Sequence, residues 1–164
     1  MSVLYISLPY FLYHYRNLLF LTPDSTPDNW HRECDRLCPA LRPLRYHGSP
    51  RERLSLQDHF TSTISTSTPC HVILTTYTLA ANASDLRFLR HCRPDYLVLD
   101  EGHMMKNINS QRYVALNRIR APNRLLLTGT PLQNSLQELL ALLNFIMPGL
   151  FGNRVADVYK AFAK

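Results

Sequence analysis

Four short runs of apolar residues recur along the chain, and small or polar residues follow each of them. They occupy residues 17–22, 71–75, 96–100 and 124–128. Their apolar character is continuous rather than alternating, which is typical of strands covered on both faces. We therefore expect a strand at each run. We expect a further strand at residues 41–46, where a His-Gly-Ser-Pro sequence follows.

Segments with helical patterns separate the expected strands. We expect helices at residues 28–38, 51–60, 85–91, 110–119 and 135–147. This alternation predicts an α/β fold in which helices flank both sides of a parallel sheet. The Ser/Thr-rich residues 61–69 offer little to bury, so we expect a surface loop or a flexible insertion there.

The composition supports a single globular domain with an anionic partner. The 164 residues are enough for one domain, and a hydrophobic content of 46% can fill its core. Lysine and arginine total 18 against 12 acidic residues, which gives a net charge of +6. This excess of positive charge favours a partner such as nucleic acid.

Two alternative readings concern the cysteines and the first residues. A zinc site could be formed by Cys34 and Cys38 together with His31 and His71, but no second paired motif at zinc-site spacing follows. We expect half-buried, reduced thiols at all four cysteines instead. Residues 1–16 are apolar and rich in tyrosine, but they lack a basic start and the length of a membrane span, which argues against a targeting role.

The chemistry is concentrated at Asp100 and Glu101, which follow an apolar run. One carboxylate of such a pair can hold Mg²⁺, and the other can orient or deprotonate an attacking water. An acidic pair at this position is also a common structural cap. Here Gly102 and His103 follow directly, and the sequence Leu-Leu-Leu-Thr-Gly-Thr-Pro-Leu-Gln-Asn follows at residues 125–134. The acidic pair with its following residues and the sequence at residues 125–134 together are a more specific signal than either one alone.

These motifs resemble those of the Swi/Snf family of DNA-translocating ATPases, in helicase superfamily two. Residues 100–103 are similar to the family's Asp-Glu-x-His box, and residues 128–134 to its motif III. Residues 22–30 and 74–77 resemble two motifs on the DNA side. The glycine at the third position of the box and the sequence of residues 144–151 are together most similar to those of the DEAD/H-box-containing, nucleosome-handling subgroup. The resemblance covers residues 18–151 and implies a partial RecA-like first lobe, of the P-loop NTPase type.

The resemblance also implies roles for single residues, with ATP and Mg²⁺ as cofactors. Asp100 would coordinate Mg²⁺, and Glu101 would be the catalytic carboxylate. Binding of the nucleotide would be coupled to the DNA by His103, Thr128, Thr130, Gln133 and Asn134. The DNA backbone would be contacted by Thr22, Pro23, Thr75 and Thr76. The implied partners are double-stranded DNA and nucleosomes or chromatin, and the implied location is the nucleus.

Three departures from the family limit what this chain is expected to do alone. Its three lysines, Lys106, Lys160 and Lys164, all follow residues other than glycine, so it holds no Gly-Lys-Ser/Thr phosphate loop. We expect residues 1–17 to be an atypical N-terminal segment. Residues 152–164 are expected to form a helical tail that ends before a second ATPase lobe. ATP turnover by this fragment is therefore not expected, and a non-catalytic module that binds DNA or a remodeller is the alternative.

Two further residues have competing interpretations. Lys106 could contact a phosphate or could be an ordinary solvated lysine. Trp30 is expected to anchor the core or a helix, because one aromatic residue does not form a base-stacking array.

Overall fold

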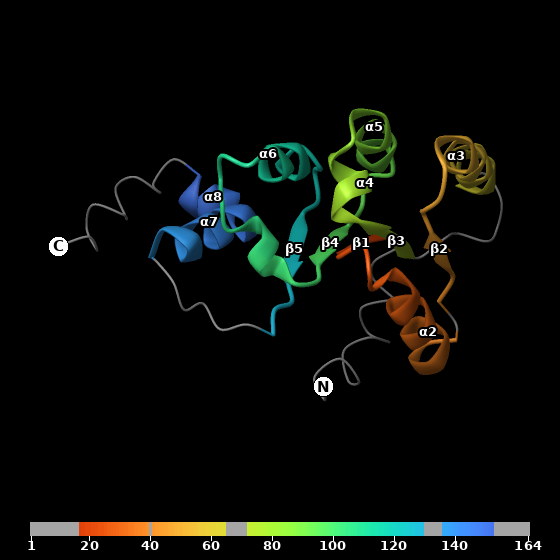
Figure 1. Ribbon diagram of the computed structural model, residues 1–164, viewed down its shortest axis with the longest axis horizontal. Helices are drawn as coiled ribbons and strands as arrows, with labels where there is room; N and C mark the ends of the chain where they lie inside the picture. Colours follow the sequence, from red (N-terminus) through yellow and green to blue (C-terminus); the bar gives the residue numbers. More distant parts are fainter. Residues whose placement is uncertain (1–16, 40, 65–71, 130–135, 153–164) are drawn as a thin grey trace.

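All five strands of the sheet run parallel, in the spatial order β2-β3-β1-β4-β5 (Figure 1). This computed structural model describes residues 17–39, 41–64, 72–129 and 136–152. The strands are β1 (Leu18–Thr22), β2 (Pro43–Arg45), β3 (Val72–Thr76), β4 (Tyr96–Leu99) and β5 (Asn123–Leu126). Each lies at an expected position, with its ends shifted by two residues at most, so the predicted parallel sheet is confirmed.

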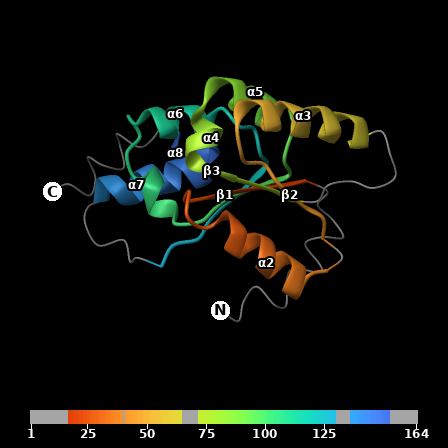
Figure 2. The same cartoon turned by 45° about the vertical axis from the view of Figure 1, so that its right-hand side comes forward.

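Helices cover both faces of this sheet, as predicted. In Figure 2, α2 lies on one side of the sheet, and α3, α4, α5 and α6 lie on the other. The helical segments are α2 (Pro27–Leu37), α3 (Pro50–Ile64), α4 (Tyr77–Ala81), α5 (Ala83–His91), η1 (Gly102–Met105), α6 (Gln111–Asn117), α7 (Leu136–Ile146) and α8 (Pro148–Phe151).

Alternate side chains of the central strands fill two separate cores. Leu19 and Leu21 of β1 belong to the larger core, which α3, α4, α5, α6 and α7 complete. Leu18 and Phe20 belong to the smaller core on the side of α2. Because both faces of β1 are buried, every residue of this strand is shielded from solvent. This explains the continuous apolar runs in the sequence.

The expectation of a loop over residues 61–69 is wrong for its first four residues, because α3 continues to Ile64. The Thr61 hydroxyl donates a hydrogen bond to the Gln57 carbonyl oxygen, at 2.8 Å. This bond to the preceding turn uses the polar group that would otherwise compete with the helix. Phe60, which is buried in the larger core, fixes this part of α3 on the sheet.

The sequence analysis does not predict the short segments α4, η1 and α8. None of them is longer than five residues, so none is long enough to show a helical period. Local capping defines α4, whose first turn is closed when the Thr76 hydroxyl accepts a hydrogen bond from the Leu79 amide. This short helix places Tyr77 beneath the carboxyl end of β4.

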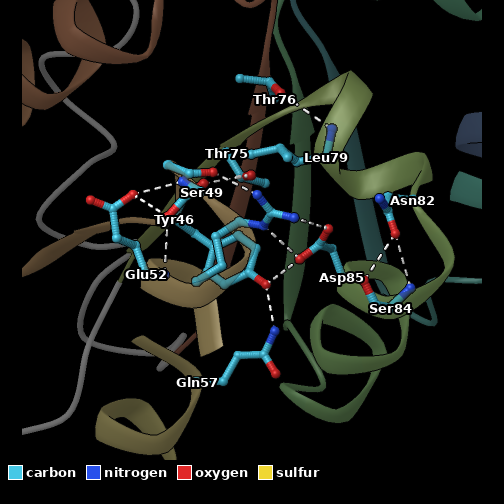
Figure 3. A network of polar contacts seen from close by, with 12 residues as sticks. Tyr46, Ser49, Glu52, Gln57, Thr75, Thr76, Leu79, Asn82, Ser84 and Asp85 are labelled. Carbon is cyan, nitrogen blue, oxygen red and sulfur yellow. Dashed lines mark hydrogen bonds and ion pairs between the residues drawn. The ribbon is translucent and has the colours of Figure 1, made fainter. Parts of the chain in front are cut away.

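A buried ion pair joins α3 to α5 beside the end of β2 (Figure 3). The Arg53 guanidinium donates to both oxygens of Asp85, at 2.9 and 3.1 Å, and the two side chains are only 9% and 2% exposed. The Tyr46 hydroxyl donates to the same carboxylate at 2.5 Å. Burial, and then this hydrogen bond, raise the pKa of Tyr46 to about 12. The network therefore holds three elements together.

The inner face of α2 carries two of the cysteines. Cys34 and Cys38 are half-buried against the smaller core, as expected. Burial raises the pKa of the Cys34 thiol to about 11, so it stays protonated at neutral pH. Cys70 and His71 lie outside the described residues. None of the helices described here combines the length and the apolar character needed to cross a bilayer.

Candidate functional site

The acidic pair lies where β4 ends, next to the carboxyl end of the central strand β1. The Asp100 amide donates to the Leu21 carbonyl oxygen at 2.8 Å, which extends the pairing of β4 with β1. Glu101 then adopts a left-handed backbone conformation with a φ of 51°. This conformation costs a non-glycine residue about 1–2 kcal/mol. Strain of this kind collects at functional sites, where the surrounding structure holds it in place.

Hydrogen bonds from two other segments fix the position of Asp100. The Trp30 indole nitrogen donates to Asp100 Oδ2 at 2.8 Å, and the Glu101 amide donates to Oδ1 at 3.0 Å. The Tyr77 hydroxyl donates to the Asp100 carbonyl oxygen at 2.7 Å. Burial, and then the nearby charge of Asp100, raise the pKa of Tyr77, so its hydroxyl remains a donor. Both the backbone and the carboxylate of Asp100 are therefore held in place.

Trp30 both packs in the core and donates to the acidic pair. Its ring lies against Phe20, with ring centroids 4.5 Å apart, in agreement with the expected packing role. Its hydrogen bond to Asp100 was not predicted from the sequence. No spacing rule could have found it, because the two residues are separated by 70 positions. The bond links α2 directly to the carboxylate at the end of β4.

The Glu101 carboxylate lies beside the His103 ring. Glu101 Oε2 lies 3.1 Å from His103 Nδ1, and each side chain is about two-fifths exposed. The Glu101 carboxylate is therefore accessible to solvent. Lys106 forms an ion pair with Glu138 of α7, at 3.3 Å, and its side chain is 44% exposed, as for an ordinary solvated lysine. Contact between Lys106 and a phosphate stays a prediction.

Gly102 allows β5 to approach the acidic turn. A Cβ atom at this position would come within 2.7 Å of a Leu126 methyl group and 3.1 Å of the Leu126 Cβ atom. The Gly102 amide also donates to the Leu127 carbonyl oxygen at 2.8 Å. A larger residue would push the turn away from β5. The absence of a side chain at Gly102 therefore lets the acidic turn lie close to the end of β5, where exposed Thr128 follows.

The threonines expected on the DNA side lie at the same edge of the sheet, with their hydroxyls turned inward. Thr22, Thr75 and Thr76 are fully buried. The Thr75 hydroxyl donates to the Tyr46 carbonyl oxygen, and the Thr22 hydroxyl to the Pro23 carbonyl oxygen. Thr76 caps α4. Exposed Asp24, Ser25 and Thr78 form the outer surface here. Contact between DNA and the predicted residues stays a prediction.

The predicted residues Thr130, Gln133 and Asn134 lie outside the described residues. Among those described, no group of three or more His, Cys, Asp or Glu side chains forms a metal-binding cluster. Two neighbouring carboxylates still fit Mg²⁺, because this ion prefers hard oxygen ligands and is commonly held by one or two carboxylates together with waters and phosphates. Asp100 would supply the protein's share of such ligands, and Glu101 lies next to it in the chain.

The parallel sheet, its flanking helices and the acidic turn at the end of β4 define a RecA-like α/β lobe. A family model described as the SNF2-related domain matches residues 6–163. The match covers nearly the whole chain, and the chain belongs to this family. The resemblance to Swi/Snf ATPases is thereby confirmed.

Curated relatives support the same assignment. The human SWI/SNF-related matrix-associated actin-dependent regulator of chromatin subfamily A containing DEAD/H box 1 is 45% identical over 88% of this chain. The Saccharomyces cerevisiae ATP-dependent helicase FUN30 is 49% identical over 81% of the chain. The alignments span only 14% and 12% of these proteins, respectively.

A solved structure has the same architecture. The Sulfolobus solfataricus SWI2/SNF2 ATPase core in complex with dsDNA aligns with a TM-score of 0.71 and 28% sequence identity. The alignment covers 90% of this chain and 28% of that one. The observed sheet therefore corresponds to part of an SNF2 ATPase core.

Proposed function

We propose that this chain forms part of the first lobe of an ATP-dependent DNA translocase that acts on chromatin in the nucleus. The observation that carries the proposal is the acidic turn at the end of β4, where Trp30 and Tyr77 hold Asp100 while Glu101 stays accessible. The names of the curated relatives, chromatin regulators and an ATP-dependent helicase, support the same role. Double-stranded DNA and nucleosomes are the proposed partners.

The two carboxylates have different proposed roles. Asp100, which is held by three hydrogen bonds, would bind Mg²⁺ with ATP. Glu101 would orient or deprotonate the attacking water, a role that requires access to solvent. His103 lies beside Glu101 and would transmit the state of the nucleotide, together with Thr128 and Thr130. Gln133 and Asn134 would support this coupling.

A specific feature of the sequence favours a second candidate for the 164 residues taken alone. No lysine among them follows a glycine, so they hold no phosphate loop. A phosphate loop supplies backbone and lysine contacts to the nucleotide, and an arginine finger adds about 10³- to 10⁵-fold in rate. The chain alone would then be a non-catalytic module that binds DNA or a remodeller.

DNA binding by the isolated chain is expected to be weak and independent of base sequence. Contacts with the phosphate backbone give dissociation constants of about 10⁻⁴ to 10⁻⁶ M, which increase with salt. A negative charge at exposed Ser25, in the loop after β1, should weaken binding several-fold, and Ser25→Glu tests this. The measurement is fluorescence anisotropy with short labelled duplexes at low and high salt.

Ser55→Glu is the matched control, because it adds the same charge at an exposed position on α3. It should leave the affinity nearly unchanged. Equal weakening by the two variants would show that only net charge matters. That result, or a strong preference for one base sequence, would contradict a DNA surface at the ends of β1 and β3.

Trp30→Phe should raise the Mg²⁺ concentration that turnover requires, because it removes the indole donor to Asp100. Loss of a hydrogen-bond partner behind a metal ligand typically costs about 10- to 100-fold in metal affinity or activity. The measurement is the Mg²⁺ concentration for half-maximal ATP turnover. It is made in a polypeptide that joins these residues to a phosphate-loop segment and a second lobe.

Phe20→Leu is the control for packing, since it removes the ring against Trp30 and leaves the indole donor in place. Both variants should lower the free energy of unfolding, but only Trp30→Phe should raise the Mg²⁺ requirement. An equal Mg²⁺ shift in the two variants would reduce Trp30 to a packing residue.

A further inference from the structure

A basic cleft of about 990 Å³ opens at the edge of the sheet where β4 and β5 begin. Its walls come from the end of α5, the loop before β4, and the residues between α6 and β5. Basic side chains line this cleft, which we call the arginine cleft: five arginines, Arg87, Arg90, Arg93, Arg118 and Arg120, together with His91 and Arg124. A four-residue strand is about 13 Å long, so the cleft is separate from the acidic turn at the other end of β4.

The arginine cleft has little negative charge of its own. Asp95 is the single carboxylate among the described residues that line it, and it accepts a hydrogen bond from the Asn17 amide at 3.1 Å. Within the described part of the chain, none of the five arginines of the cleft forms an ion pair. Their guanidinium groups therefore remain available to an external anion.

Arg124, at the base of the cleft, has a structural role instead. Its guanidinium donates to the Phe145 carbonyl oxygen at 2.8 Å and to the Ile119 carbonyl oxygen at 3.0 Å. The same group lies over the Phe145 ring, 4.5 Å from the centroid. Arg124 thus joins α6 and α7 to β5. Among the described residues, the other five arginines of the cleft make no comparable side-chain hydrogen bonds.

The backbone at Arg93 is an independent sign that its side chain matters. Arg93 has a φ of 47°, in the left-handed region that glycine adopts at much lower cost. It lies two residues after the end of α5, where helices commonly finish on a glycine. An arginine at this position keeps a cation in the cleft at a cost to folding.

We propose that the arginine cleft binds a compact, multiply phosphorylated small molecule. Its volume, which equals that of a cube with edges of about 10 Å, is near the upper end of the range for small-molecule sites. Five guanidinium groups can make bidentate contacts with phosphates. About 10 Å of one DNA strand presents only three phosphates, and an extended acidic peptide of that length about three carboxylates. A compact polyphosphate places the matching negative charge in this space.

The test uses the 164-residue chain and calorimetric titration with inorganic tripolyphosphate. Inorganic phosphate, a hexaglutamate peptide and a short DNA duplex are titrated in parallel. Tripolyphosphate should bind at least about tenfold more tightly than inorganic phosphate, because each additional hydrogen bond to a charged group contributes enough for about that factor. Tighter binding of the peptide or the duplex through the same arginines would overturn the proposal and assign the cleft to that partner.

Two variants localise the binding. Arg93→Gly and Arg118→Gln should each weaken tripolyphosphate binding about tenfold. Arg93→Gly should leave the melting temperature unchanged or higher, because glycine accepts the left-handed backbone. Arg51→Gln, at an exposed position on α3, is the matched control and should bind like the unaltered chain. Unchanged binding in both cleft variants, or equal loss in the control, would refute the assignment.

Discussion

Glu101→Gln is expected to lower ATP turnover about 10²- to 10⁴-fold, the usual contribution of a general base. The amide keeps the size of the side chain and removes the group that would act on water. Nucleotide binding should stay nearly intact, so the maximal rate should fall and the Michaelis constant should change little. The measurement is phosphate release from a polypeptide that joins these residues to a phosphate-loop segment and a second lobe.

Two further variants separate the proposed roles of the acidic pair. Asp100→Asn should weaken Mg²⁺-dependent nucleotide binding, because a neutral amide is a poorer partner for a hard divalent cation. Glu33→Gln is the control for Glu101→Gln, since it makes the same chemical change in an exposed ion pair on α2. Full turnover with glutamine at position 101 would remove the catalytic role of Glu101.

Arg53→Ala is expected to lower the free energy of unfolding by about 3 kcal/mol, the lower end of the range for breaking a buried ion pair. The loss is large because Asp85, which is 2% exposed, would keep its charge without its cation. Among the three joined elements, the Tyr46 hydroxyl would then be the single hydrogen-bond donor left to the Asp85 carboxylate. Urea denaturation followed by circular dichroism measures the change.

Arg51→Ala provides the comparison, because Arg51 is exposed on the same helix two residues earlier. Its effect should stay within about 0.5 kcal/mol, as for most surface substitutions. A similar small loss in Arg53→Ala would mean that Asp85 finds water or another donor when Arg53 is removed. The ion pair would then contribute little to the attachment of α3.

The sequence by itself determined most of the sheet. Strands covered on both faces need continuous apolar residues, and such runs are visible without any knowledge of their neighbours. The acidic turn was also found from the sequence, since Asp100, Glu101 and Gly102 are consecutive. Capping and short helices were harder to predict. The extension of α3 to Ile64 accompanies burial of Phe60 and a hydroxyl bond from Thr61 to the preceding turn, and neither leaves a periodic signal.

Only the tertiary structure decided which distant side chains meet. Trp30 reaches Asp100 across 70 positions, and Arg53 reaches Asp85 across 32. The cleft likewise combines arginines from the ends of α5 and α6, and the buried Thr22 lies at the end of a strand that β3 and β4 enclose. The physical reason is that local patterns record which face of an element is apolar. They do not record which polar groups the packed elements bring within hydrogen-bonding distance.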